Sequence, residues 1–317
     1  MVLEFISDYM EGDLWERLCD MCYRVKYQDE GYQKLPAISG GDGGIEGFTR
    51  TGIVYQCYCP ERKYSEKEQY EHMRNKMTAD IKKLLNESYA KRLKAFGVTL
   101  IKEWHFVIPE YGDTEIIKHA MSKTNEVLTA KKANPKIYDY IDDSFTILVK
   151  VADDFSDQIY RVVRNKFIDT KLNLTIKSIG DIDWTKCESD KVKNIDRKVR
   201  AVMGPNPDEE DVQFIIKRYI KYYLKGIEIL KRLRISFSEV YEQIIGLEQS
   251  YKEQVSMQTR MNGNSSLNRK IFEDILEDFE KKLKDELEDF SWESILELKR
   301  DIVSSWLADC SMQFKSR

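Results

Sequence analysis

The sequence of 317 residues lacks any apolar run that approaches the ~20 residues needed by a membrane-spanning helix. Its first residues, MVLEFISDYMEGD, contain no basic segment followed by an apolar one, so we expect no secretory signal peptide. Cysteine is scarce, and without a secretory signal the six cysteines are expected to be reduced thiols. These absences predict a cytoplasmic protein without a membrane partner.

Two common catalytic signatures are also missing. The sequence has no Gly-Lys-Ser or Gly-Lys-Thr phosphate loop, so we expect no ATP hydrolysis by that route. No local motif suggests a Ser/His/Asp arrangement. The net charge of -4 argues against a generally basic coat for nucleic acid. Residues 161–200 are an exception, because eleven Lys and Arg face six Asp and Glu there.

The first half of the chain has the pattern of a compact α/β core, with helices beside a small sheet. Strand formers fill 52–59, 104–109 and 144–152, whereas helical spacing of apolar residues covers 13–27 and predicts one or two helices over 65–96. Ser65 and Glu68 have the spacing of a capping box, which places a helix start there.

The second half changes character after Pro205-Asn206-Pro207. From residue 209 onward the sequence predicts four helical stretches and no strand, which is typical of an antiparallel helical module. The apolar stripe expected on the first of these helices is Ile216, Ile220, Tyr223, Ile227 and Leu230. Ser236 and Glu239 predict a capping box that opens the next helix. We therefore predict two domains, 1–205 and 206–317.

The stretch GGDGGIEGFTRTGIVYQCYCPE, residues 40–61, places two acids among glycines before a predicted strand. Carboxylates ~4 Å apart repel by roughly 4 kcal/mol at an effective dielectric near 20, unless a cation or a proton intervenes. The glycines allow the tight turns that would bring Asp42 and Glu46 to one edge. Hard oxygen ligands suit Mg²⁺ or Mn²⁺. A solvated turn with two ordinary acids is the alternative.

This stretch resembles the core of the PD-(D/E)XK nuclease superfamily, in the restriction-endonuclease-like branch typified by Mrr. The resemblance covers about a third of the chain and rests on GDGGIEGF followed by GIVYQCY. It implies a nuclease core with a small mixed sheet flanked by helices, and it makes Glu46 a metal ligand. Gln56 matches the acid-or-glutamine position on the next strand, and Glu16 in LWERL matches a glutamate from the preceding helix.

The sequence departs from the family pattern at two positions. Glu46 stands where aspartate is usual, which a metal ligand tolerates. Tyr58 stands where a lysine usually offsets the charge on the phosphate, and a tyrosine with a pKa near 10 carries no charge at neutral pH. A lysine from elsewhere is one explanation, with Lys76 and Lys63 as candidates. The other is a domain that binds but does not cleave.

Two functions follow from the resemblance. One is a metal-dependent DNA endonuclease with Mg²⁺ or Mn²⁺ held by Glu16, Asp42 and Glu46, as found in bacterial anti-phage defence systems. The other is a catalytically inactive scaffold or DNA-binding subunit of a multi-protein complex. In either case the C-terminal helices are expected to bind a protein partner, such as an ATPase or sensor subunit, or to form a homo-oligomer.

Further basic and thiol groups keep alternatives open. The DNA backbone is expected to contact the basic stretch 161–200 or the group Lys82, Lys83, Lys91 and Arg92, which are otherwise solvated faces. The tyrosines 219, 222 and 223 alternate with the lysines 217, 221 and 225, a pattern compatible with stacking on single-stranded nucleic acid or with an ordinary helix face. Two cysteine pairs, 19/22 and 57/59, indicate core packing or a structural zinc.

Overall fold

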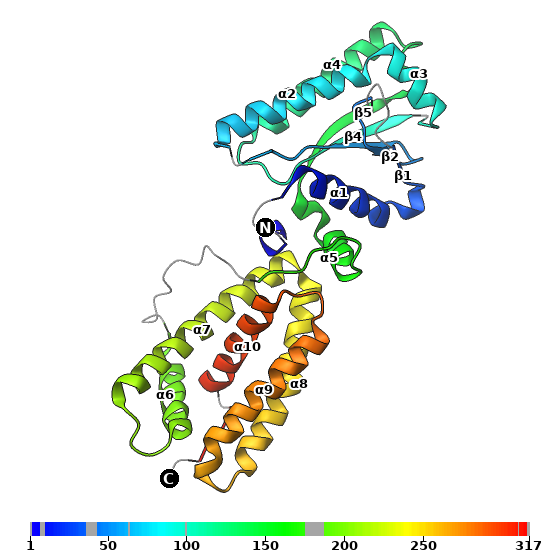
Figure 1. The fold of residues 1–317 in the computed structure, drawn as a ribbon. Helices are drawn as coiled ribbons and strands as arrows, with labels where there is room; N and C mark the ends of the chain where they lie inside the picture. The colour runs from blue at the N-terminus through cyan, green and yellow to red at the C-terminus, as the bar shows by residue number, and fades with distance from the viewer. Residues whose placement is uncertain are drawn as a thin grey trace. The chain divides into compact units, whose positions relative to one another are not determined.

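The computed structural model describes residues 2–6, 10–35, 43–62, 64–98, 100–174, 187–309 and 311–315. The chain divides into two compact units, drawn in Figure 1. The first comprises residues 1–3 and 7–170, and the second comprises residues 4–6 and 171–317. The predicted boundary after residue 205 falls within the second unit. Among the described residues, no helix combines the length and the apolar character that crossing a membrane requires.

A five-stranded mixed sheet forms the centre of the first unit. Its strands lie side by side in chain order: β1 (Gln33–Lys34), β2 (Gly47–Phe48), β3 (Ile53–Cys57), β4 (Ile101–Val107) and β5 (Ile141–Lys150). The first three strands pair antiparallel, and β3, β4 and β5 pair parallel. The predicted α/β class and its three strands are confirmed, while the two-residue strands β1 and β2 had no pattern of their own in the sequence.

The strand register assigns each side chain of β3 to one of two faces, because successive residues point in opposite directions. Gln56 pairs with Phe106 of β4, and both point to one face. Tyr55 pairs with His105, and both point to the other face. The two faces are covered by different helices, so neighbouring residues of β3 have different environments.

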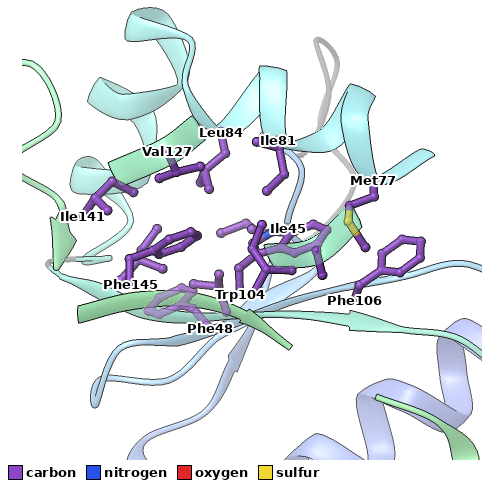
Figure 2. Packing of buried hydrophobic residues seen from close by; sticks show 14 of the residues in the cluster. Ile45, Phe48, Met77, Ile81, Leu84, Trp104, Phe106, Val127, Ile141 and Phe145 are labelled. Atoms are coloured by element: carbon purple, nitrogen blue, oxygen red, sulfur yellow. The ribbon is translucent and has the colours of Figure 1, made fainter. Parts of the chain in front are cut away.

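The face of Gln56 is covered by α2 (Glu66–Leu84) and α4 (Glu115–Ala133). Figure 2 shows side chains of both helices above the apolar side chains of the sheet. Met77, Ile81 and Leu84 of α2 are completely buried against residues that include Trp104 of β4. This apolar layer is the main core of the first unit.

The opposite face is covered by α1 (Gly12–Lys26), which is followed by η2 (Gln28–Glu30). The helix α5 (Ser156–Arg164), which follows η3 (Ala152–Phe155), packs against α1. The indole N–H of Trp15 donates to the carbonyl of Val107, 3.3 Å away. The ring of Tyr23 stacks on Tyr55 with the centroids 3.9 Å apart. The amphipathic helix predicted at 13–27 is thus confirmed, and it buries its apolar side on the sheet.

The helical region predicted at 65–96 consists of two helices, α2 and α3 (Glu87–Ala95). The predicted capping box is present, because the Ser65 hydroxyl accepts from the backbone of Glu68 and the Glu68 carboxylate accepts from the backbone of Ser65. Asn86 caps the start of α3 by accepting from the backbone of Ser88. An extended asparagine between the two helices therefore ends one helix and opens the next.

The second unit is built of helices joined by short connections, and its described residues include one isolated bridge, between Leu172 and Phe290. Its long helices are α6 (Ser189–Met203), α7 (Glu209–Ser236), α8 (Ser238–Met261), α9 (Asn268–Glu286) and α10 (Trp292–Ala308), with the short turn η5 (Ser265–Leu267). The turn η1 (Val2–Phe5) has residues in both units. The four helices predicted after residue 209 are confirmed as α7 to α10.

Two details predicted for α7 are wrong. Ser236 does not cap the next helix, because it is the last residue of α7. The helical conformation is interrupted at the following residue, Phe237, which is buried. The apolar stripe leaves the core at Ile227, whose side chain is 49% exposed. Gly226 faces α10 instead, because an added Cβ would lie 2.8 Å from the Cβ of Asp301, so the backbone of α7 lies close to α10 there.

The C-terminal end of α10 is held by a lysine of α6. Lys198 is completely buried, and its ammonium donates to the backbone carbonyls of Trp306, Leu307 and Asp309. Asn194, one turn earlier on α6, donates to the carbonyl of Ala308 at 3.0 Å. The last carbonyls of a helix lack partners within it and carry its negative dipole end, so a cation that satisfies them is stabilising.

We expect Lys198→Met to destabilise the helical unit by about 3 kcal/mol, because it leaves several buried carbonyls without a donor. The exposed Lys193 lies on the same helix, 3.7 Å from Asp190, and Lys193→Met is expected to be nearly neutral. Urea unfolding followed by circular dichroism measures both. Equal midpoints for the two variants would show that the buried ammonium is not a stabilising cap.

Candidate functional site

Glu46 is fixed by the backbone of the strands on both of its sides. Its carbonyl accepts from the amide of Leu35, and its own amide donates to the carbonyl of Tyr55, both at 2.7 Å. The register of β2 on β3 pairs Gly47 with Tyr55, which sets Glu46 across from Gln56. The half-buried carboxylate of Glu46 thus has a position determined by main-chain hydrogen bonds.

Gln56 is the polar residue on the core face of β3, and its side chain is only 1% exposed. Its amide nitrogen donates to Glu46 Oε1 at 2.6 Å and lies 3.4 Å from the carbonyl of Cys57. Its amide oxygen is buried and has no hydrogen-bond partner among the described residues. A buried oxygen without a donor costs about 1–3 kcal/mol, so its retention beside a carboxylate points to a cation or a water as its partner.

The glycine turn before Glu46 packs directly on α2. Gly43 and Gly44 have φ values of 70° and 78°, in the left-handed region that favours glycine. A Cβ added to Gly44 would lie 2.4 Å from the backbone oxygen of Asp80. The carbonyl of Gly44 also accepts from the indole of Trp104 at 3.0 Å. Asp42, the other acid predicted at this turn, lies outside the described residues.

Glu16 of α1 meets a lysine that the sequence did not single out. Its carboxylate lies 3.0 Å from the ammonium of Lys34 on β1. Burial opposes the charge of Lys34, but the hydrogen bond to Glu16 and the charges of Glu16, Asp20 and Glu46 raise its pKa above the ordinary value. Lys34 therefore stays protonated through neutral pH, within electrostatic reach of both predicted ligands, Glu16 and Glu46.

The lysine candidates proposed from the sequence are placed differently. The ammonium of Lys76 lies 2.8 Å from the carboxylate of Asp80, which is completely buried in α2 and also meets Lys83 at 3.0 Å. Lys76 is thus engaged in the ion pairing of a buried acid. Lys63 lies outside the described residues. Lys34 on the edge strand is a lysine that interacts with the charge of Glu46, and no local motif around QKLP could have indicated it.

Tyr58 continues the line of β3, with its amide donating to the carbonyl of Val107 at 2.9 Å. Its ring lies parallel to that of Phe106, with centroids 6.4 Å apart, and packs on the apolar core. Burial raises the pKa of the Tyr58 hydroxyl, with smaller contributions from Tyr64, Cys59 and Glu61. Tyr58, at the position where the sequence resemblance leads one to expect a lysine, is therefore neutral at physiological pH.

A buried polar network lies on the α1 face of the same sheet. Tyr32 donates to Asp20 at 2.6 Å, and its hydroxyl lies 3.0 Å from that of Tyr55. The hydroxyl of Tyr23 lies 2.7 Å from Nδ1 of His105. The other ring nitrogen of His105, Nε2, lies 2.8 Å from the carboxylate of Glu103. A carboxylate only accepts, so Nε2–H donates to Glu103 and Nδ1 accepts from Tyr23. Burial lowers the pKa of His105, which keeps the imidazole neutral in this arrangement.

The cysteine pairs lie near this network as thiols. Cys19, Cys22 and Cys57 are buried, and burial raises the pKa of Cys19 and of Cys22 well above the ordinary value. Burial also raises the pKa of Cys59 to about 11. Zinc binds the thiolate, so these positions favour the protonated, apolar form of the side chain. Within the described ranges, no group of three His, Cys, Asp or Glu residues is arranged to hold a metal ion.

We expect Gly44→Ala to destabilise the first unit by more than 2 kcal/mol, because it adds backbone strain and a clash with Asp80. Gly97 at the end of α3 is the matched control, since its φ is 88° and an added Cβ meets nothing within 4 Å. Gly97→Ala should cost only the strain, about 1 kcal/mol. Thermal unfolding separates the two contributions, and a smaller loss for Gly44→Ala than for Gly97→Ala would contradict the packing of the turn on α2.

Comparison of the chain with protein families, with curated proteins and with solved structures gave no match.

Proposed function

We propose that the first unit is a metal-dependent endonuclease that cleaves DNA phosphodiester bonds, as the nuclease component of a bacterial anti-phage defence system. The observation that carries the proposal is the pair formed by Glu46 and Gln56, where a carboxylate is fixed beside a buried amide oxygen that lacks a donor. The resemblance of GDGGIEGF and GIVYQCY to the PD-(D/E)XK superfamily supplies the reaction class.

The donors present fit Mg²⁺ or Mn²⁺. The carboxylate of Glu46 and the amide oxygen of Gln56 are hard oxygen ligands, whereas sulfur and nitrogen ligands would favour zinc. Mg²⁺ commonly binds through one or two protein oxygens and takes its remaining ligands from water and substrate phosphate. Glu46 and Gln56 would therefore hold the ion, with Asp42 as a further ligand suggested by the sequence. When bound, such an ion polarises a phosphate and lowers the pKa of a water.

The chain's own residues then have distinct roles. The β-sheet hydrogen bonds and the Gln56 amide keep the Glu46 carboxylate in place, so no reorganisation is needed when substrate binds. Lys34 offers a permanent positive charge beside the acids, which would offset the charge that develops on the phosphate oxygens. In this proposal Lys34 fills the role left vacant by Tyr58.

A second candidate function is an inactive nuclease-like scaffold or DNA-binding subunit of a larger complex. The packing of Tyr58 on Phe106 and the pairing of Lys76 with Asp80 favour it, because neither side chain is available for catalysis. The scaffold hypothesis predicts that no lysine acts beside Glu46, so the two functions differ in what they require of Lys34.

We expect Glu46→Ala to reduce Mg²⁺- or Mn²⁺-dependent plasmid cleavage at least about 100-fold, because it removes the metal-binding carboxylate. Glu71→Ala, at an exposed acid of α2, is the matched control and should cleave like the wild type. Mn²⁺ binding measured by electron paramagnetic resonance gives a readout that does not depend on turnover. Equal cleavage and equal Mn²⁺ binding by the two variants would refute the site.

Lys34→Met should lower the cleavage rate about 100-fold while leaving Mn²⁺ binding in place, and Lys34→Arg should restore part of the rate because it keeps the charge. The raised pKa of Lys34 means that its charge is lost only above its ordinary titration range, so this lysine should impose no decline in rate between pH 6 and 9.

Lys76→Met is the comparison for this experiment. It should leave the rate unchanged but lower the melting temperature, because Asp80 remains buried with one lysine fewer. Loss of cleavage in Lys76→Met with an unaffected Lys34→Met would assign the cationic role to α2 instead of β1.

A further inference from the structure

The outer side of α7 carries a basic and aromatic patch in the first half of the helix. Between Phe214 and Ile227 the sequence has four basic residues and no acid. Lys217, Arg218 and Lys221 are exposed, and within the described chain none of them forms an ion pair. The fourth basic residue, Lys225, forms an ion pair with Glu297 of α10, with the ammonium 2.5 Å from the carboxylate. A protein of net charge -4 thus concentrates three available cations on two turns of one helix.

Aromatic rings lie among these cations. The guanidinium of Arg218 lies 5.2 Å from the ring centre of Phe214, which is itself 58% exposed. Tyr222, four residues after Arg218 and so on the same side of the helix, lies 5.9 Å from the guanidinium of Arg300 on α10. The Tyr222 and Lys221 side chains proposed from the sequence are therefore available, whereas Tyr219 packs inward against Phe272.

An apolar pocket of about 300 Å³ opens beside this patch. Ile215 and Tyr219 of α7 line one side, and Met203 and Phe272 line the others. Ile215 lies three residues before Arg218, so the pocket and the cations are neighbours on the helix surface. The pocket has room for a planar aromatic ring system, and the charged side chains among its described lining residues, Arg269 and Glu273, form an ion pair with each other at 3.1 Å.

We propose that this surface of the second unit binds single-stranded nucleic acid, with phosphates on Lys217, Arg218 and Lys221 and an unpaired base in the pocket beside Tyr219. Cations in a row match the spaced negative charges of a phosphate backbone, and the exposed rings provide stacking surfaces that tolerate any base. A base enters an apolar pocket only when it is not paired, which selects a single strand over a duplex.

The same helix is poorly suited to an anionic membrane. Interfacial helices insert an apolar face into the lipid, but the apolar face of α7 is used inside the bundle, where Ile216, Ile220, Ile229 and Leu233 are buried. The surface that remains is charged, with isolated apolar side chains such as Phe214, Ile227 and Ile235. The binding proposed here is also independent of Glu46, because it involves only residues of the second unit.

Fluorescence anisotropy of the full chain, in EDTA to prevent cleavage, tests the proposal with a labelled 20-nucleotide oligothymidylate and a 20-base-pair duplex. The wild type should bind the single strand more tightly. Lys217→Glu combined with Lys221→Glu should weaken binding roughly tenfold and reduce the slope of log K against log salt by about 1.4, which corresponds to two lost contacts with a single strand.

The matched control reverses two exposed lysines of α9, Lys270→Glu with Lys281→Glu, which gives the same change in net charge. It should alter affinity less than twofold. Equal weakening by the two double variants, duplex binding as tight as single-strand binding, or binding of phosphatidylserine vesicles without binding of the oligonucleotide would each overturn the proposal.

The outcome is separable from the proposed nuclease activity. Glu46→Ala should retain full oligonucleotide binding, and the α7 double variant should retain plasmid cleavage at saturating substrate. Loss of oligonucleotide binding in the α7 double variant, together with unaffected cleavage by Glu46→Ala, would support this inference while refuting the nuclease site. Unchanged oligonucleotide binding by the α7 double variant, together with loss of cleavage in Glu46→Ala, would refute this inference and leave the nuclease site standing.

Discussion

One cross-strand contact organises the candidate site. Glu46 and Gln56 face each other at the start of β2 and the end of β3, on the sheet face that otherwise buries apolar side chains. A one-residue change in the register of β2 on β3 would place the two polar groups on opposite faces of the sheet. The glycine turn against α2 and the backbone hydrogen bonds of Glu46 with Leu35 and Tyr55 hold that register. The chemistry available to the first unit therefore depends on a short antiparallel pairing.

The charge balance around this contact differs from what the local sequence suggests. The position after Gln56 on the same face is occupied by a neutral tyrosine that belongs to the core. Lys34, on the edge strand β1, pairs with Glu16 and interacts electrostatically with Glu46, which follows it by 12 residues in the chain.

Local patterns predicted the fold well, because helices and long strands are determined by short-range periodicity. The capping box at Ser65 and the strand around Gln56 were found in this way. The residues that were missed depend on long-range pairing. Lys34 lies on a two-residue strand that exists only through its partner β2, and Lys198 contacts α10 across more than a hundred residues. The predicted cap at Ser236 failed because a buried phenylalanine moved the helix break.

Lys198 of α6, which caps the C-terminal end of α10, has a consequence for experiments in solution. Its acceptors are neutral peptide oxygens inside the bundle, so mobile ions have little access to this contact and should weaken it far less than pairs on the surface. The contact between Lys198 and the end of α10 should thus remain equally stabilising as ionic strength rises. A salt titration of the protein then reports on its outward-facing charges and not on loosening of the helices that carry them.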